Sequence, residues 1–426
     1  MDISANKYLK SNAVYSILRV GLSSISTLLV TPFVIAKIGL EQYGYISITY
    51  FFIAFSNLLD FGLSKSLVFL LNTKQVTKEH KDQIISGVLY INIGVILLLS
   101  GVFVCLCLFE IPLLGSTISL SNSYYKALVM SSILVLFLTL YNLFQSALLE
   151  SCFMLNKVNE GLMLKVLILN LLYLFNALSI NNIMLYIISS IISLSLVTCY
   201  YQFYIYKNLN INLCTVDKYN LKLICRTTYG YAKVGIMTSL NSALPRLLLI
   251  YVGNSLAYIS LFDVISKVTM AMLNLLSTVY RPLYALVRVN AEKIKKNMTK
   301  ILIVNTAFVF SFLFALILFS DYLIDYLLPD TEYDILFLRL LFLLFGLYGS
   351  LLTYSQPLSM YFLGLGRNDI ISKSLIFNTI SFLVSFSILN FFTNCNILYD
   401  IGISSVILAI IYDFVLYFNY RRLAWN

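Results

Sequence analysis

The stretch GLEQYGYISITYFFIAFSNLLDFGLSKS, residues 39–66, is the part of the chain that decides its predicted fold. It is a long apolar run that begins at an aromatic and glycine corner, Tyr43 to Tyr45, and ends in the polar segment 58–66. A simple membrane anchor has no need of aspartate, glycine and lysine at the end of its apolar run. The stretch therefore predicts one helix of a larger membrane assembly.

The composition of the whole chain supports this interpretation. Of its 426 residues, 60% are hydrophobic and 11% are charged, and the mean hydropathy is +0.88. That is too little charge to cover the surface of a soluble protein of this length. The apolar segments are about 20 residues long, which favours helices over the strands of a barrel, about 10 residues of alternating character. We therefore expect an all-α polytopic membrane protein.

Hydropathy and loop residues predict twelve transmembrane helices. Their expected spans are 12–35, 43–71, 84–109, 125–149, 162–179, 183–206, 229–252, 255–283, 300–327, 335–363, 370–392 and 397–419. With a cytoplasmic N-terminus, 19 lysines and arginines fall in inside segments and 2, Lys37 and Lys126, in outside ones. The positive-inside rule therefore predicts that both termini are cytoplasmic. The first apolar segment has no cleavage motif after it, so we expect it in the mature protein.

The sequence also suggests that the chain consists of two similar halves. Pro32 and Pro245 lie 213 residues apart, and each is followed by a Tyr-Ile-Ser sequence, at 45–47 and 258–260. Coincidence in so biased a composition is the alternative explanation of this match. We predict a parallel 6+6 pseudo-repeat with a cavity at the seam. The domains are an N-terminal six-helix bundle at 1–206, a cytoplasmic linker at 207–226 and a C-terminal six-helix bundle at 227–426.

The sequence lacks the residues that several classes of function require. The seven cysteines are scattered and the single histidine, His80, sits in a charged loop, so we expect no disulfide framework and no metal site. There is no Walker motif, which argues against ATP hydrolysis by this chain. The net charge of +10 is dispersed over loops, so we expect no nucleic-acid partner. No cofactor is predicted.

Particular motifs carry a resemblance to a known family. TPFVIAKIGLEQYGYISI at 31–48 and LLDFGLSKS at 58–66 resemble the N-terminal signature of Wzx-type polysaccharide flippases. These form the polysaccharide transporter branch of the multidrug/oligosaccharidyl-lipid/polysaccharide (MOP) exporter superfamily. The Asn156-Lys157 turn and YGYAKVG at 229–235, expected to open the seventh helix, are also similar to that family.

The resemblance implies a function. Members of the family move an undecaprenyl-diphosphate-linked oligosaccharide, an O-antigen or capsule repeat unit, from the cytoplasmic to the periplasmic leaflet by alternating access. It implies a multi-pass protein of the bacterial inner membrane that is a transporter and not an enzyme, with the bilayer and other glycan-assembly membrane proteins as partners. This chain departs from relatives that carry an acid near the middle of the seventh helix, since it has Pro245 and Arg246 there.

Eight basic residues lie inside the predicted helices: Arg19, Lys65, Lys165, Lys233, Arg246, Lys267, Arg281 and Arg339. A cation at the centre of a membrane helix costs about 2.5–3.5 kcal/mol on insertion scales, so it usually faces a cavity or a partner. Four of them are assigned to a cationic substrate-binding cavity that would hold a pyrophosphate: Arg19, Arg246, Lys267 and Lys65.

The other four are expected to be structural. Lys165, Lys233 and Arg281 are placed within about one turn of the cytoplasmic face, from which they can snorkel to headgroups. Arg339 is expected to pair with Glu332 or Asp334 near the outer edge.

Three acids are candidates for ion coupling: Asp60, Asp263 and Asp413. Asp60 has two alternatives, a cap at the broken end of the second helix or a contact with Lys65, and a structural role is preferred. Asp263 and Lys267 stand at i and i+4, so they can neutralise each other on one helix face. Pro32 and Pro245 are predicted hinges, because proline removes a backbone hydrogen bond and permits a kink.

Two other function classes remain as alternatives. A multidrug efflux transporter of the same superfamily would suit an acidic cavity, whereas here bases outnumber acids in the helices. A membrane glycan polymerase or glycosyltransferase would be expected to carry a sizeable loop outside the membrane, and the longest loop here is about 20 residues.

Overall fold

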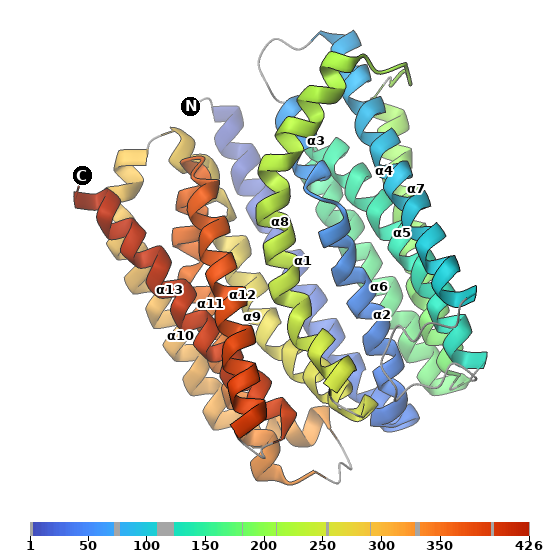
Figure 1. The fold of residues 1–426 in the computed structure, drawn as a ribbon, viewed down its shortest axis with the longest axis vertical. Helices are drawn as coiled ribbons and strands as arrows, with labels where there is room; N and C mark the ends of the chain where they lie inside the picture. The colour runs from blue at the N-terminus through green and yellow to red at the C-terminus, as the bar shows by residue number, and fades with distance from the viewer. Residues whose placement is uncertain are drawn as a thin grey trace. The chain divides into compact units, whose positions relative to one another are not determined.

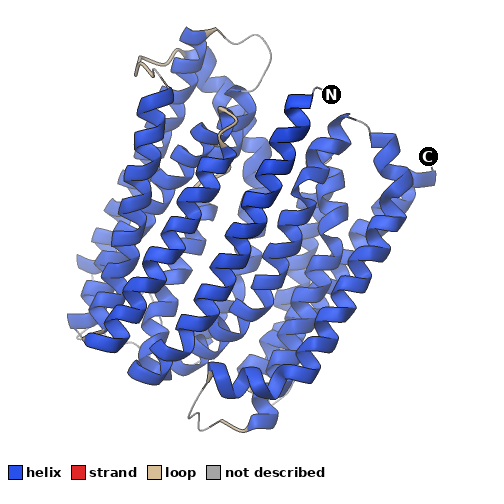
Figure 2. Cartoon of the chain, turned by 180° about the vertical axis from the view of Figure 1, so that it is seen from behind, coloured by secondary structure: helices blue, strands red, loops and turns tan. Residues whose placement is uncertain are grey.

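The computed structural model describes residues 3–71, 77–108, 123–180, 182–209, 211–252, 255–289, 291–328, 333–392 and 396–425. All regular structure in these ranges is helical (Figures 1 and 2). The described residues form thirteen helices: α1 (Ile3–Ile38), α2 (Leu40–Leu59), α3 (Leu63–Leu71), α4 (Lys78–Leu108), α5 (Ser123–Ser151), α6 (Leu155–Ser179), α7 (Ile183–Asn208), α8 (Lys218–Val252), α9 (Leu256–Val289), α10 (Ala291–Leu327), α11 (Ile335–Gly364), α12 (Asn368–Phe392) and α13 (Ile397–Trp425).

The helices pack into two compact units. Unit 1 consists of residues 1–40 and 257–426, so it holds α1 and α9 to α13, while unit 2 is residues 41–256 and holds α2 to α8. In unit 1, α13 packs against α11 and α12, and α11 also packs against α10. In unit 2, α7 packs against α5 and α6, and α3 packs against α5 and α8.

These units differ from the predicted halves by one helix each. The first helix, α1, groups with the C-terminal helices, and α8 groups with the N-terminal ones. The predicted linker 207–226 is helical in its second part, because α8 begins at Lys218. The domain boundaries, the 6+6 repeat and the cytoplasmic termini stay predictions, although the start of α1 and the end of α13 lie at the same end of unit 1 (Figure 1).

The predicted span 43–71 contains two helices, α2 and α3, and this break accounts for the thirteenth helix. Phe61 and Gly62 have φ angles of 46° and 75°, in the left-handed region that ends helices. The Asp60 carboxylate accepts hydrogen bonds from Ser64, at 3.2 Å from its backbone nitrogen and 2.6 Å from its hydroxyl. Asp60 therefore caps α3, which is the structural role preferred from the sequence.

Close helix contacts within unit 2 depend on two glycines. A Cβ at Gly62 would lie 2.8 Å from the Cβ of Tyr231 on α8, so only glycine allows this approach. A Cβ at Gly161 on α6 would overlap the ring of Tyr201 on α7. The Tyr201 hydroxyl in turn donates to the Val158 carbonyl at 2.9 Å. These contacts fix how α3 meets α8 and how α6 meets α7.

A proline in unit 1 has its missing hydrogen bond replaced by a side chain. Pro357, inside α11, has no N–H to donate to the carbonyl of Thr353 four residues earlier. The fully buried Asn305 of α10 donates from Nδ2 to the carbonyls of Thr353 at 3.1 Å and Tyr354 at 3.2 Å. The amide therefore satisfies a backbone group that would otherwise be unpaired inside the bundle.

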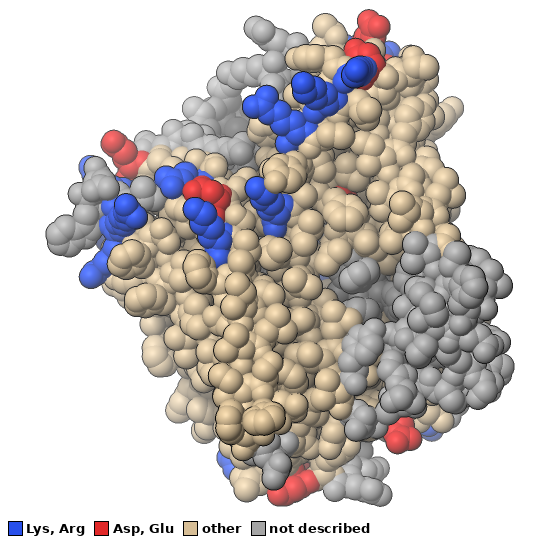
Figure 3. Space-filling view, viewed as in Figure 1, with Lys and Arg blue, Asp and Glu red and all other residues tan. Residues whose placement is uncertain are grey.

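The surface of each unit fits a membrane environment. Nine helices among the described residues are long and apolar enough to cross a bilayer. Their outward faces expose large apolar side chains such as Leu97, Leu98 and Phe310. In Figure 3 most of the visible lysines and arginines gather near one end of each unit, over the first part of α8 in unit 2 and near the end of α13 in unit 1. Next to these basic side chains, the visible surface of each unit is formed mainly by uncharged residues.

Candidate functional site

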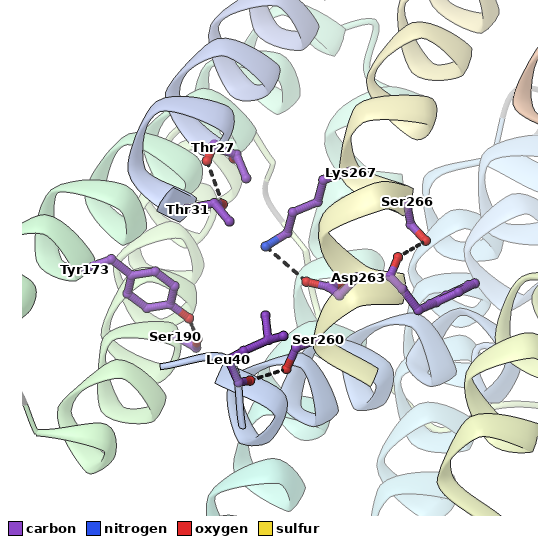
Figure 4. A network of polar contacts seen from close by, with 10 residues as sticks. Thr27, Thr31, Leu40, Tyr173, Ser190, Ser260, Asp263, Ser266 and Lys267 are labelled. Atoms are coloured by element: carbon purple, nitrogen blue, oxygen red, sulfur yellow. Dashed lines mark hydrogen bonds and ion pairs between the residues drawn. The ribbon is translucent and has the colours of Figure 1, made fainter. Parts of the chain in front are cut away.

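The polar contacts of α9 centre on an ion pair. Lys267 Nζ lies 3.1 Å from Asp263 Oδ2, one turn earlier on the same helix (Figure 4). The side chains are 17% and 2% exposed. The predicted i, i+4 pair is therefore confirmed, and the positive charge of Lys267 is offset locally rather than left for a substrate alone.

Unit 1 has further polar contacts on α1 and at the start of α9. The Ser260 hydroxyl, one turn before Asp263, donates to the Leu40 carbonyl at 2.6 Å (Figure 4). On α1, the Thr31 hydroxyl donates to the Thr27 carbonyl at 2.7 Å, immediately before Pro32. These bonds place polar side chains along helices that are otherwise apolar.

The four cationic residues predicted to share a cavity divide equally between the units. Arg19 on α1 and Lys267 on α9 belong to unit 1, and both are half-buried. Arg246 on α8 and Lys65 on α3 belong to unit 2. Arg246 is half-buried directly after Pro245, whereas Lys65 is exposed. Their assignment to one binding site stays a proposal.

Lys165 lies farther from the start of its helix than the sequence predicted. Asn156 and Lys157, expected in a turn, belong to the first turn of α6, which begins at Leu155 and not near residue 162. Lys165 is therefore ten residues into the helix, about 15 Å at 1.5 Å per residue. It is close to the middle of the candidate membrane span Leu155–Ser179. The expectation that it snorkels to headgroups from within about one turn of the cytoplasmic face stays a prediction.

Lys165 has neither an ion pair nor a hydrogen bond with any described residue. The acid nearest to it in the sequence, Glu160, is already engaged by Lys157 Nζ at 2.7 Å and by the Tyr200 hydroxyl at 2.6 Å. A half-buried lysine inside an apolar span without a counter-charge is the kind of group that serves an anion. The early start of α6, signalled by the polar residues 156–160, is the sequence feature that could have revealed it.

Two of the other basic residues, Lys233 and Arg339, contact an aromatic ring and an acid, respectively. Lys233 is exposed and its Nζ lies 4.5 Å from the centre of the Tyr229 ring. Arg339 was expected to pair with Glu332 or Asp334, but its Nε lies 3.6 Å from Asp321 at the end of α10. Asp334 instead caps α11 by accepting from the Leu336 nitrogen at 3.1 Å. Glu332 and the side chain of Arg281 lie outside the described residues.

The three acids proposed for ion coupling differ in their contacts. Asp60 is held by Ser64 in the cap of α3, and Asp263 is held by Lys267. Asp413 on α13 is 8% exposed, and neither of its carboxylate oxygens has a hydrogen-bond partner among the described residues. Of the three acids, Asp413 is the one with neither a basic partner nor a capping role among the described residues.

The predicted hinges lie inside continuous helices. Pro32 is within α1 of unit 1, and Pro245 is within α8 of unit 2. Bending at these positions remains a prediction. The described residues contain no group of three or more histidine, cysteine or acidic side chains that could hold a metal ion.

Comparison with known proteins identifies the fold. No family model matches the chain, and no curated protein matches it. A solved multidrug resistance MATE family transporter of the MOP superfamily, in its inward-facing conformation, aligns with a TM-score of 0.69 and 13% identity over 96% of this chain and 99% of its own. An outward-facing structure of such a transporter gives 0.68 and 14%, over 98% and 95%.

A third similar structure is a MOP superfamily transporter from Pyrococcus furiosus, described as having a binding pocket of reverse polarity that suggests a different function. It aligns with a TM-score of 0.66 and 13% identity over 98% of this chain and 96% of its own. Identities this low support the fold and not the substrate. The protein is a multi-pass membrane protein with the fold of MOP-superfamily transporters, the superfamily to which the sequence resemblance pointed.

Proposed function

We propose that this protein is a flippase that moves an undecaprenyl-diphosphate-linked oligosaccharide, an O-antigen or capsule repeat unit, across the bacterial inner membrane by alternating access. The observation that carries the proposal is Lys165, a cation without a counter-charge near the middle of a candidate membrane span. The half-buried Arg19 and Arg246 add guanidinium groups to apolar helices. Such donors suit a diphosphate, which carries about two negative charges, better than a cationic drug.

The direction of transport needs no covalent reaction. Moving negative charge outward across an inside-negative membrane is favoured by about 2.3 kcal/mol per charge per 100 mV, hence about 4 to 5 kcal/mol for a dianion. The membrane potential can therefore bias the movement by itself. The fold is shared with transporters, which supports this class over a glycan polymerase or glycosyltransferase.

The second candidate is multidrug efflux, and the solved structures favour it. Two of the similar structures are multidrug resistance transporters. Against it stands the unpaired Lys165, since a cationic drug would be repelled by it. The transporter from Pyrococcus furiosus is described as having a binding pocket of reverse polarity, so the polarity of the pocket is not the same in all proteins with this fold.

Deletion of the gene in its host separates the two candidates. For a flippase, the deletion strain should lose surface glycan and accumulate lipid-linked repeat units on the cytoplasmic side, while its sensitivity to cationic drugs stays unchanged. For an efflux pump, drug sensitivity should rise and the surface glycan should be normal. That second outcome would refute the flippase proposal.

Complementation with variants tests the site. Lys165→Gln should fail to restore surface glycan at normal protein levels, and Lys165→Arg should restore part of it. The matched control is Lys222→Gln, an exposed lysine in the first part of α8 of the same unit, which should restore glycan fully. Full rescue by Lys165→Gln would exclude a role for Lys165 in binding the substrate.

A further inference from the structure

We propose that a hollow on the surface of unit 2, between α5 and α7, binds a membrane phospholipid with an anionic headgroup. The hollow lies wholly within this unit, where α5 and α7 pack against each other. Its volume is about 470 Å³, and it is lined by Tyr141 of α5 and by Thr198, Cys199, Gln202, Phe203 and Tyr206 of α7. Ligand sites commonly have volumes of about 300–1,000 Å³ and combine apolar and aromatic walls with a few polar groups.

The lining residues of α7 lie on one face of that helix. Cys199, Gln202, Phe203 and Tyr206 stand at i, i+3, i+4 and i+7, a spacing that repeats on one side of an α-helix. Phe203 is 59% exposed and Tyr206 is 85% exposed. Helices associate in membranes through small residues that let their backbones approach, so two protruding aromatic rings disfavour another helix on this face. A flexible acyl chain can lie between such rings.

The amide of Gln202 supplies a hydrogen-bond donor to the lining of the hollow. Its Oε1 accepts from the Tyr141 hydroxyl at 3.2 Å and from Gln145 Nε2 at 2.9 Å. The Gln145 nitrogen also donates to the Thr198 carbonyl at 3.3 Å, and this bond fixes the orientation of both amides. Gln202 Nε2 is left without a partner among the described residues. In a bilayer, a lipid carbonyl or phosphate oxygen can satisfy this donor.

The position of Gln202 along α7 matches the depth of lipid ester groups. The candidate membrane span begins at Ile183, after the N-cap residue Asn182. Gln202 is 19 residues farther along the helix, about 28 Å at 1.5 Å per residue. The hydrocarbon core of a bilayer is about 30 Å thick, so the amide lies near the level where acyl chains meet their ester groups. Tyr206, one turn later, lies where tyrosines are enriched at the membrane interface.

A basic side chain beside the hollow favours an anionic headgroup. Lys207 is exposed in the last turn of α7, four residues after Phe203 and therefore on the same side of the helix. It has neither an ion pair nor a hydrogen bond with any described residue. Lysines at the membrane surface attract anionic lipids. The arrangement suits a lipid whose chain lies against Phe203, whose carbonyl accepts from Gln202 and whose phosphate reaches Lys207.

Fluorescence quenching by brominated lipid tests the site in the full-length chain, reconstituted in vesicles. Trp425, the single tryptophan of the sequence, is replaced by phenylalanine. One tryptophan is then introduced, either by Phe203→Trp in the hollow or by Leu196→Trp at an exposed residue of α7 outside it. The probe is brominated phosphatidylglycerol diluted in unbrominated phosphatidylcholine, with quenching normalised to that in brominated lipid alone.

The affinity for phosphatidylglycerol relative to phosphatidylcholine should be at least about threefold higher at the tryptophan of Phe203→Trp than at that of Leu196→Trp. Equal affinities would mean that only unselective lipid surrounds the helix. Protection of the Phe203→Trp reporter from every brominated lipid would mean that a second protein chain covers the face. Either of these results overturns the proposal.

A second substitution in the Phe203→Trp protein tests the amide. Gln202→Leu should lower the affinity about threefold, the size of an average hydrogen bond between membrane helices. The matched control is Asn208→Leu, which removes an exposed amide of α7 whose Nδ2 donates to the Tyr204 carbonyl of its own helix at 2.8 Å. This control should leave the affinity unchanged. An equal loss in both variants, or none in Gln202→Leu, contradicts the proposed hydrogen bond.

Lys207→Gln tests the headgroup and remains informative if Gln202→Leu does not fold, because Lys207 is exposed and outside the packing of α5 on α7. It should remove most of the preference for phosphatidylglycerol over phosphatidylcholine. An unchanged preference overturns the assignment of an anionic headgroup. The flippase proposal does not depend on these results, because Lys165 is not part of the hollow.

Discussion

Replacing Asn305 by leucine should destabilise unit 1 through the backbone of α11. The amide donates to the Thr353 carbonyl, whose usual helical donor is absent because residue 357 is proline. Leucine has a similar volume and no donor, so the substitution removes the hydrogen bond with little change in packing. The carbonyl of Thr353 is then buried without a partner.

The size of the effect follows from that carbonyl. An unsatisfied buried polar group costs about 1–3 kcal/mol, whereas hydrogen bonds between membrane helices average about 0.6 kcal/mol with a maximum near 1.7 kcal/mol. We expect a loss of about 1–2 kcal/mol, because Pro357 leaves the Thr353 carbonyl without its usual helical donor. In a Pro357→Ala background the restored N–H can donate to Thr353, so the same substitution should cost less than about 0.5 kcal/mol.

The assay is a double-mutant cycle of Asn305→Leu and Pro357→Ala, with reversible unfolding followed in mixed micelles. A coupling energy of about 1 kcal/mol is expected. Asn297→Leu is the control on the same helix, since Asn297 is exposed and donates only to the Lys293 carbonyl of its own helix. Its effect should be small and additive with Pro357→Ala. If the costs of Asn305→Leu and Pro357→Ala add to within about 0.3–0.5 kcal/mol, the proposed link between the amide and the proline is refuted.

Three further predictions concern stability, each measured by thermal or detergent-induced unfolding. Gly62→Ala should cost more than about 1 kcal/mol because φ is 75° and the new methyl meets α8, whereas Gly230→Ala, with open space around it, should be neutral or stabilising. Asp60→Ala should cost about 0.5–2 kcal/mol through loss of the α3 cap, with Asp60→Asn closer to the unmodified protein; equal losses would contradict capping. Asp263→Asn should cost about 3 kcal/mol, and adding Lys267→Met should recover most of it; no recovery would contradict the ion pair.

The candidate site was predicted only where it depends on local chemistry. Asp263 and Lys267 are four residues apart on one helix, and Asp60 and Ser64 are four apart across the start of α3, so sequence spacing reveals both contacts. The partner of Arg339 was predicted from nearby acids in the sequence, but the structure supplies Asp321 from the preceding helix. The position of Lys165 along its helix was predicted wrongly, because the start of α6 was placed about two turns too late.

The sequence by itself determined that this is a helical membrane protein. Long apolar runs with little charge can only be helices in a bilayer, because every backbone polar group there must be satisfied within the segment. The break after α2 and the likeness to the MOP superfamily were also readable, the first from Asp60 and Gly62 and the second from the motifs around them.

Only the tertiary structure decided which helices pack together and which polar groups are compensated. Sequence order placed α1 with its neighbours, yet α1 groups with α9 to α13. Asn305 satisfies a carbonyl freed by Pro357, 52 residues away, whereas Asp413 is buried without a basic partner among the described residues. Hydropathy cannot distinguish these two polar residues, because compensation depends on the side chains that packing brings from other helices.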